Sequence, residues 1–310
     1  MGKNQQREEA PWNGILCIDK AQTYTSFDVI ARMRGILHTK RLGHAGTLDP
    51  MATGVLPIFV GRATRACDIL PDQDKAYRAS FQLGLTSDTQ DIWGKVTGRE
   101  GTPKITLQML ETVLAQFRGD ILQVPPMYSA IQVGGQRLYD LARQGIEVER
   151  EAREIHVERL DLLSFSEKTQ SGVIEVECSK GTYIRTLCHD IGAALGTGAV
   201  MTALRRIHAA GFSEQDCLTL EQLQEIARSG NVEDYVHPIG EAFASLPAVE
   251  LDASRTKMFL NGVRLDLRKI RCPAAEGDIR VIGCDGSFLG IAVRDIEKKE
   301  LRSKKIFVGR

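Results

Sequence analysis

The stretch GHAGTLDPMATGVLPIFVG, residues 43–61, joins a glycine-rich polar loop directly to an apolar segment. Two glycines and a proline within residues 43–50 predict a shaped loop, because both residue types interrupt helices and strands. The apolar run at 55–60 predicts a buried strand. Asp49 therefore stands on a loop anchored to a rigid core, where catalytic groups concentrate. Asp-Pro pairs also commonly begin turns, so a purely structural role for Asp49 stays open on spacing alone.

Apolar residues recur with helix and strand periods on both sides of this loop. Spacings of three and four indicate helices, whereas alternation and short apolar runs indicate strands. The expected strands are 14–19, 55–60, 77–83 and 174–178, and the expected helices are 25–37, 62–70, 107–117, 184–195 and 220–226. Thr25 or Ser26 can cap the first helix, and Thr219 with Gln222 forms a capping box for the last. The mixture of periods indicates an α+β protein.

The character of the sequence changes at three places. Residues 1–11 are polar, lack the apolar stretch of a secretory signal and are expected to form a disordered leader. Within the body at 12–247, residues 125–150 carry Pro-Pro and Gly-Gly pairs among polar residues, which indicates an insertion lying over the body. The pattern then shifts to short strands with glycine turns, so we expect a second, small domain at 248–310.

Charge is balanced over the whole chain but not along it. The 40 Lys and Arg match the 40 Asp and Glu, yet residues 251–310 hold 14 basic against 8 acidic residues, and residues 1–250 hold 26 against 32. A basic C-terminal part on a mildly acidic body is compatible with a polyanion partner held by local patches. The last basic cluster, which either meets phosphates or is a solvated face, is Arg294, Lys298, Lys299, Arg302, Lys304 and Lys305.

Neither a membrane span nor a disulfide framework is expected. The chain has no stretch of about 18 apolar residues. Its 7 cysteines are scattered without a C-x-x-C pair, which argues against disulfides and a zinc site and favours reduced thiols in the cytoplasm. His44 has no second histidine at metal-ligand spacing, so we expect no metal there, and a base or a simple loop residue stays open.

Two further residues stand out by their positions. Arg185 falls in the first turn of the helix at 184–195, where a cation opposes the helix dipole at a cost of roughly a few tenths of a kcal/mol. A nearby anion would explain it, and so would a side chain turned into solvent. Tyr77 begins an alternating strand, where most tyrosines simply pack. Motifs of a P-loop, a zinc deaminase, a serine hydrolase and a dinucleotide-binding fold are absent.

Taken together, these segments resemble the TruB family of transfer-RNA pseudouridine synthases. The Gly-Thr-Leu-Asp-Pro segment at 46–50 and the Lys-Gly-Thr-Tyr-Ile-Arg segment at 180–185 are specific in combination. The matching segments are 14–20, 43–57, 77–78, 83–94, 125–130, 180–187, 204–206 and 211–212. The C-terminal residues 249–310 resemble, more weakly, a small RNA-binding barrel of the PUA type.

The resemblance implies the pseudouridine synthase fold, a mixed and largely antiparallel central sheet flanked by helices, followed by a small PUA-like β-barrel. It implies isomerisation of the uridine at position 55 in the T-loop of transfer RNA, without a metal or another cofactor. Asp49 would attack the target nucleotide and Arg185 would pair with it. Tyr77 would stack on the everted uracil, a contact worth about 1–3 kcal/mol. Whether Asp49 attacks C1′ of the ribose or C6 of the base stays open.

The same resemblance assigns four residues to substrate binding. Tyr183 and Leu204 would line the pocket, and His44 would fill the gap left in the T-loop when nucleotides are extruded. Lys20, grouped with them, would support the loop. It is followed by Ala21 where the family usually has proline, which bears on the rigidity of the loop and not on the chemistry.

Transfer RNA, through its T-arm and T-loop, is the expected partner. The chain is expected to act as a monomer in the cytoplasm, with no obligate protein partner. Two alternatives stay open: an RNA-binding or RNA-folding protein whose site is incidental, and a guide-RNA-dependent synthase that works within a larger complex. The insertion at 125–150 favours an enzyme that grips its own RNA.

Overall fold

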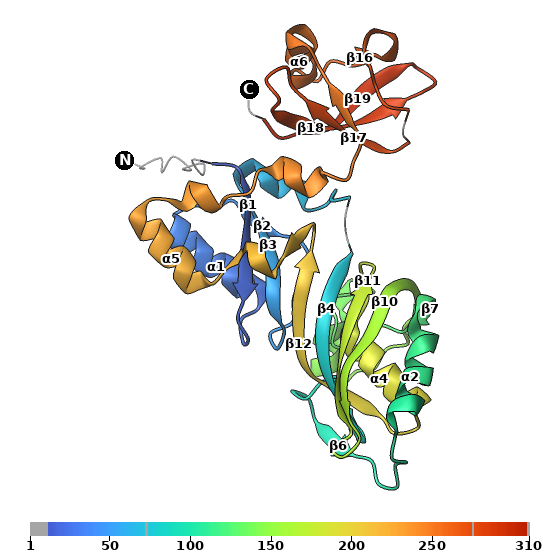
Figure 1. The fold of residues 1–310 in the computed structure, drawn as a ribbon. Coiled ribbons are helices and arrows are strands. Elements are labelled where there is room, and N and C mark those ends of the chain that lie inside the picture. Colours follow the sequence, from blue (N-terminus) through green and yellow to red (C-terminus); the bar gives the residue numbers. More distant parts are fainter. Residues whose placement is uncertain (1–11, 72–73, 275, 309–310) are drawn as a thin grey trace.

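A central sheet of 10 strands organises the body of the molecule (Figure 1). The computed structural model describes residues 12–71, 74–274 and 276–308, so the leader expected at 1–11 lies outside the described residues. The main path of the sheet is β14 (Cys217–Leu218), β1 (Gly14–Lys20), β3 (Thr53–Val60), β12 (Ala199–Ala209), β4 (Lys75–Leu83), β11 (Ser171–Cys178), β10 (Arg153–Ser166) and β7 (Gly119–Gln123). Two short strands are added to it, β2 (Leu42–His44) beside β3 and β13 (Phe212–Ser213) beside β12.

Most neighbouring strands of this sheet are antiparallel. Among the described strands of this sheet, β1 with β14 and β3 with β12 are the parallel pairs. In β11 every second residue is buried, which confirms the alternation expected there. In β3 the whole run from Gly54 to Val60 is buried, because both faces of this strand are covered. The mixed, largely antiparallel sheet expected for the body is thereby confirmed.

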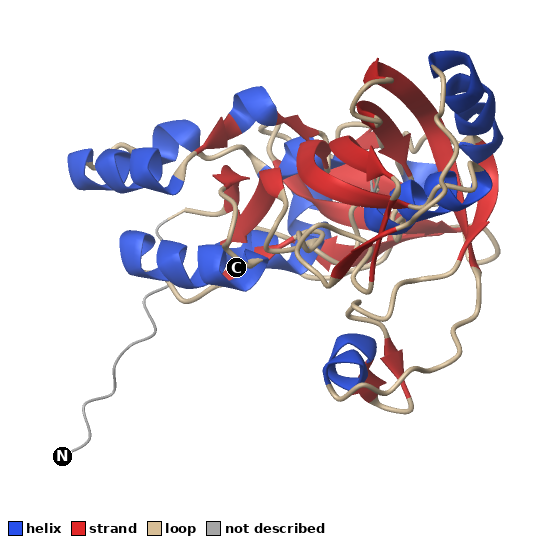
Figure 2. Ribbon diagram, turned by 90° about the horizontal axis from the view of Figure 1, so that it is seen from below, coloured by secondary structure: helices blue, strands red, loops and turns tan. Residues whose placement is uncertain are grey.

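Two groups of helices cover the two ends of the sheet (Figures 1 and 2). α1 (Ser26–Leu37) and α5 (Leu220–Ser229) lie together beside β1, and α2 (Leu107–Leu114) and α4 (Ile184–Ala194) pack near β10 and β12. Capping boxes at Thr25 and Thr219 begin α1 and α5. Each threonine hydroxyl accepts a backbone N–H of the first turn, which would otherwise have no partner.

The helix expected at 62–70 is wrong in type and extent. The chain forms instead a short 3₁₀ helix, η1 (Gly61–Ala66). The Thr64 hydroxyl donates to the Gly61 carbonyl at 2.8 Å, and such local side-chain bonds compete with a regular helix. The other 3₁₀ segments are η2 (Ala115–Phe117), η3 (Glu214–Asp216), η4 (Val232–Tyr235), η5 (Ile239–Phe243) and η6 (Leu267–Lys269).

The segment expected as an insertion, 125–150, leaves the body as a small unit. A hairpin of β8 (Gln132–Val133) and β9 (Gln136–Arg137) leads into α3 (Leu138–Arg143). Figure 2 shows a small hairpin and a short helix standing clear of the sheet on two extended loops. The other short hairpin is β5 (Leu85–Ser87) with β6 (Val96–Gly98).

A second, five-stranded sheet forms the C-terminal part of the molecule, above the body in Figure 1. Its order is β15 (Ala248–Glu250), β17 (Asp278–Ile282), β18 (Phe288–Asp295), β19 (Glu300–Ile306) and β16 (Leu265–Asp266), with α6 (Ala253–Leu260) beside it. Phe259 and Leu289 belong to a core of its own. The sheet is a half-barrel, because its two outer strands, β15 and β16, do not pair within the described residues.

Candidate active site

The loop that carries Asp49 runs from β2 to β3 and is tied down from beneath. The backbone N–H of Leu48 donates to the hydroxyl of Ser26, in the first turn of α1, at 2.9 Å. The N–H of Ala52 donates to the carbonyl of Asp49 at 3.0 Å, which closes a turn around Pro50. Leu48 is buried, whereas the Asp49 side chain stays 41% exposed. The backbone of the loop is therefore fixed while its carboxylate remains accessible.

Arg185 brings a guanidinium to this carboxylate from the start of α4. Its Nε lies 2.9 Å from Asp49 Oδ2, and its Nη1 lies 3.7 Å from Asp91 Oδ2. Nη1 and Nη2 also donate to the carbonyls of Thr89 and Tyr128 at 3.0 and 2.9 Å. The nearby anion that would explain a cation in the first turn of this helix is therefore the Asp49 carboxylate. The rigid guanidinium fork fixes the direction of that carboxylate.

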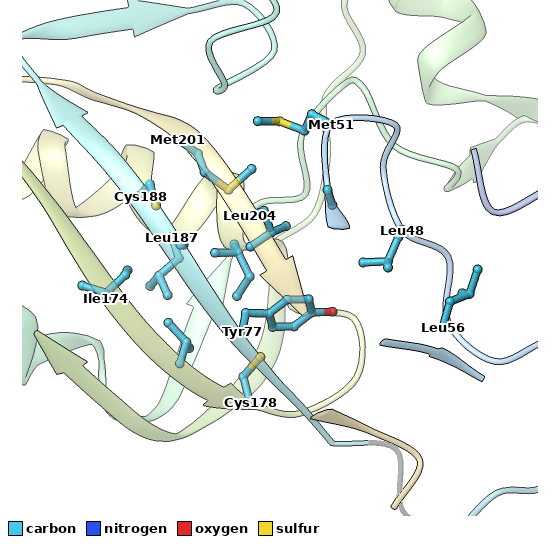
Figure 3. Close-up of a cluster of buried hydrophobic side chains, with 14 of the residues drawn as sticks. Leu48, Met51, Leu56, Tyr77, Ile174, Cys178, Leu187, Cys188, Met201 and Leu204 are labelled. Carbon is cyan, nitrogen blue, oxygen red and sulfur yellow. The ribbon is translucent and has the colours of Figure 1, made fainter. Parts of the chain in front are cut away.

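The Asp49–Arg185 pair opens onto a pocket of about 880 Å³. Pockets of about 300–1,000 Å³ are typical of sites for small molecules or single groups of a larger ligand. Tyr77 of β4, Tyr183 at the start of α4 and Leu204 of β12 line it. Figure 3 shows Tyr77 and Leu204 together on one side and Leu48 of the loop on the other. Five of the seven residues singled out from the sequence therefore meet in one pocket.

Tyr77 and Tyr183 are two of the four tyrosines that line this pocket. Burial raises the pKa of the Tyr77 hydroxyl, and the positive charge of Arg206 opposes part of that rise. Burial likewise raises the pKa of Tyr183, partly opposed by Arg185. Both phenols are therefore neutral near pH 7. Tyr77 packs in the core and lines the pocket at once, so the two roles considered for it are compatible.

Lys20 and His44 are not among the residues that line the pocket. Lys20 is 0% exposed, and its Nζ donates to the carbonyls of Tyr24 at 2.7 Å and Pro50 at 3.5 Å. Burial lowers its pKa to about 8. Lys20 thus contacts the loop from beneath. His44 ends β2 half-buried, and burial together with Arg206 lowers its pKa.

Three residues of the site were not assigned a role from the sequence. Asp91 and Trp93, between β5 and β6, line the pocket, Asp91 buried and Trp93 51% exposed at its rim. Arg206 is fully buried beneath the loop. The signal for the first two was the run of short polar side chains at 86–91, which is typical of a self-capped turn. The signal for Arg206 was a pair of arginines, Arg205 and Arg206, inside a mostly apolar run.

Among the residues that the structure describes, no three His, Cys, Asp or Glu side chains gather closely enough to hold a metal ion. All of the cysteines are free thiols. No described helix has the length and apolar character needed to cross a membrane.

Known proteins resemble this chain along nearly its whole length. Residues 34–184 match the N-terminal domain of TruB family pseudouridylate synthases, 185–244 match the tRNA pseudouridylate synthase B C-terminal domain, and 247–304 match the C-terminal region of pseudouridine synthase II TruB. The tRNA pseudouridine synthase B of Clostridium tetani is 40% identical over 287 residues, which cover 92% of this chain and 96% of the relative. That of Heliobacterium modesticaldum is 46% identical over 81% of each chain.

Two solved structures share the fold. A chain of a Cbf5-Nop10-Gar1 complex superposes with a TM-score of 0.76 over 99% of this chain and 93% of that one. A chain of an H/ACA RNP bound to a substrate RNA containing 2′-deoxyuridine superposes with a TM-score of 0.73. The match covers 96% of this chain and 86% of that one. Both are 24% identical to this chain, so they show a shared fold and nothing about function.

Proposed function

Because this chain belongs to the TruB family of pseudouridine synthases, we propose that it isomerises a uridine of transfer RNA to pseudouridine, at position 55 in the T-loop. The observation that carries this proposal is the Asp49–Arg185 pair, 2.9 Å apart on the wall of an open pocket. The reaction breaks the N1–C1′ bond and forms a C5–C1′ bond within one nucleotide. It therefore transfers no group to or from a second molecule and has no net redox change.

The target uridine must leave its base stack before Asp49 can reach it. Everting a nucleotide costs a few kcal/mol, which the pocket must return. The Tyr77 ring can supply about 1–3 kcal/mol by stacking on the uracil. Tyr183 and Leu204 line the same pocket and exclude water from the flipped base.

Asp49 acts as a nucleophile or stabilises positive charge that develops on the sugar. Arg185 holds the carboxylate and is itself held by the carbonyls of Thr89 and Tyr128, so the pair need not rearrange during the reaction. Attack at C1′ of the ribose and attack at C6 of the base both start from this geometry.

Grip on the RNA comes from the insertion at 125–150. Tyr139 of α3 lines the pocket rim, with the guanidinium carbons of Arg137 and Arg143 at 5.8 and 5.5 Å from its ring centre. Cations around an aromatic face suit an unpaired nucleotide and its phosphate. In this proposal the insertion clamps the T-arm and His44 fills the gap that the everted nucleotides leave. The chain acts alone, on free transfer RNA in the cytoplasm.

Substituting Asp49→Asn tests the catalytic assignment. The change keeps the size of the side chain but removes its charge, so isomerisation should fall on the order of 10⁴-fold. Affinity for transfer RNA should stay within about threefold, because a carboxylate does not neutralise phosphate charge and phosphate contacts dominate the affinity. Mass-spectrometric mapping of pseudouridine and filter binding measure the two quantities. Asp161→Asn, which removes an exposed ion pair with Arg159 at 3.0 Å, is the control and should keep full activity. Undiminished product from Asp49→Asn would defeat the assignment.

Incubation of the purified chain with an unmodified transfer-RNA transcript tests the proposal against its two alternatives. A stand-alone synthase forms pseudouridine at one T-loop position without further components. A guide-dependent enzyme forms none until guide RNA and protein partners are added. An RNA-binding protein with an incidental site binds the transcript and forms none under either condition.

A further inference from the structure

Arg206 lies at the seam of the central sheet, the place where β12 joins β3 to β4. In β12 it is paired with Gly54 of β3 on one side and with Tyr77 of β4 on the other. The contact between β12 and β3 comprises two residue pairs, so the seam is short. Gly54 has φ +99°, and a Cβ there would lie 2.2 Å from the Arg206 carbonyl. The two strands thus approach more closely than a residue with a side chain would permit.

The Arg206 side chain is a fully buried cation without a carboxylate partner. It is 0% exposed. Within the described chain, the groups that can carry negative charge and act on it are the phenol of Tyr77 and the thiol of Cys217. Its Nη2 has no hydrogen-bond partner there. Burying an unpaired charge is costly, and an apolar side chain of similar size would be more favourable at a purely structural position.

The contacts that the guanidinium does make bracket the loop of Asp49. Nη1 donates to the carbonyl of Gly46 at 3.1 Å, before Asp49, and Nε donates to the carbonyl of Val55 at 2.7 Å, after it. Tyr77 stands directly opposite Arg206 in antiparallel register, so both side chains lie on the same face of the sheet. The Tyr77 hydroxyl faces the guanidinium, and Figure 3 shows it directed toward the loop side of the pocket. One side chain therefore contacts both ends of the loop and the ring across from it.

We propose that Arg206 is a positioning residue for the isomerisation, which holds the Asp49 loop and the Tyr77 ring at the separation that the everted uracil fills. Arg206 does not reach the substrate, because it is sealed beneath both groups. It acts by fixing the positions of the Asp49 loop and the Tyr77 ring relative to each other. The inference rests on the proposed function and extends it, since it explains why a charge is kept at the seam.

Substituting Arg206→Lys tests this role. A lysine keeps the charge, but its single nitrogen cannot copy the planar fork that bonds the Gly46 and Val55 carbonyls together. Misplacement of a reacting group by about 1 Å costs about 10²-fold, so turnover of bound transfer RNA in a single-turnover experiment should fall by about that factor. The dissociation constant for transfer RNA should change by less than about threefold.

Arg118→Lys, at an exposed arginine that also donates twice to backbone, controls for the loss of the guanidinium fork itself. Arg118 donates through Nε and Nη2 to the carbonyl of Leu160 at 3.1 and 2.7 Å, and it is not among the residues that line the pocket. This variant should retain the turnover of the wild-type protein. Turnover of Arg206→Lys within about threefold of this control would overturn the inference.

Arg206→Gln takes the place of the lysine variant if that one does not fold, because a neutral amide is cheaper to bury than an ammonium group. It is compared with Val157→Ala, a core truncation in β10 that destabilises the fold away from the pocket. Loss of turnover confined to Arg206→Gln supports the inference, and an equal loss in both variants contradicts it. The two proposals fail separately: a wild-type chain that forms no pseudouridine contradicts the function, whereas an active wild type with an equally active Arg206 variant contradicts only the role of Arg206.

Discussion

Two cations beneath the Asp49 loop, Lys20 and Arg206, are withdrawn from water completely. Each donates to a backbone carbonyl of the loop region, Lys20 to Pro50 and Arg206 to Gly46. Loops usually lie on the surface because their backbone polar groups need partners. Here long basic side chains supply some of those partners from inside. Together with the Ser26 hydroxyl and Arg185, they hold the loop around Asp49 in place.

The pKa of Lys20 gives a prediction at this scale. It is about 8 in the folded chain against 10.5 for the unperturbed side chain, so between these values the unfolded chain binds more protons. The free energy of unfolding should therefore gain a contribution that rises with pH from about 8 to 10.5. In Lys20→Met this contribution is absent. Urea unfolding of both proteins across this window measures the free energy of unfolding of the wild type minus that of the variant, and this quantity should rise with pH. If the free energies of unfolding of the two proteins change with pH in parallel, the pKa of Lys20 is not lowered in the folded chain.

At the scale of elements, α4 begins in an unusual way. Tyr183, its N-cap residue, makes no side-chain cap. Gln123 at the end of β7 replaces it: its Oε1 accepts from the Tyr183 N–H at 2.8 Å, and its Nε2 donates to the Tyr183 carbonyl at 3.1 Å. Gln123 is 2% exposed. A side chain from the strand thus fixes the start of the helix that carries Arg185.

Gln123→Ala should therefore affect both stability and catalysis. The Tyr183 N–H loses its partner and the Tyr183 carbonyl keeps only the bond from the Leu187 N–H, at a cost of about 1–3 kcal/mol in the free energy of unfolding. Because Arg185 lies two residues further on, the catalytic rate should also fall. Gln170→Ala is the matched control, since Gln170 brackets the peptide of Ile105 by the same two bonds, at 2.9 Å each, next to α2. It should lose stability and keep its catalytic rate, and equal rates in both variants would refute the role of Gln123.

At the scale of the whole molecule, the C-terminal sheet is packed onto the body. Phe307 and Phe288 stack at 5.6 Å, and Phe307 lies 5.8 Å from Phe243 of the body, in one cluster with Ile15 of β1. The basic cluster expected to meet phosphates is partly engaged within the protein: Lys304 pairs with Asp278 at 2.7 Å, and Lys305 with Asp68 at 3.2 Å. Its contact with RNA stays a prediction, with less free charge than the sequence suggested.

Phe307→Ala should separate the two parts. The truncation removes a buried ring at their junction and should cost about 3–5 kcal/mol. We expect calorimetry to show one cooperative transition for the wild type and two for the variant, because each sheet has a core of its own. Phe307→Leu preserves most of the volume and should keep a single transition. A single transition in Phe307→Ala would mean that other contacts hold the two sheets together.

The loops and helices of the site follow from local sequence. The glycines and proline around Asp49 predict its loop, the alternation of β11 predicts its strand, and the spacing from Ile184 onward predicts α4 with Arg185 in its first turn. These signals are readable because turn chemistry and side-chain periodicity depend on residues a few positions apart. The family resemblance then supplied roles that periodicity could not.

Tertiary structure alone decided which of these residues meet. The expected strands did not include β12, since Arg205 and Arg206 break its apolar pattern. Arg205 pairs with Asp19 of β1 and with Glu214 of η3. The carbonyl partners of Arg206 come from Val55 of β3 and from Gly46 of the loop before it. From its sequence neighbours alone, a charged side chain is predicted to be exposed. Whether it is buried depends on strand pairing across long separations, and local pattern carries no information on that pairing.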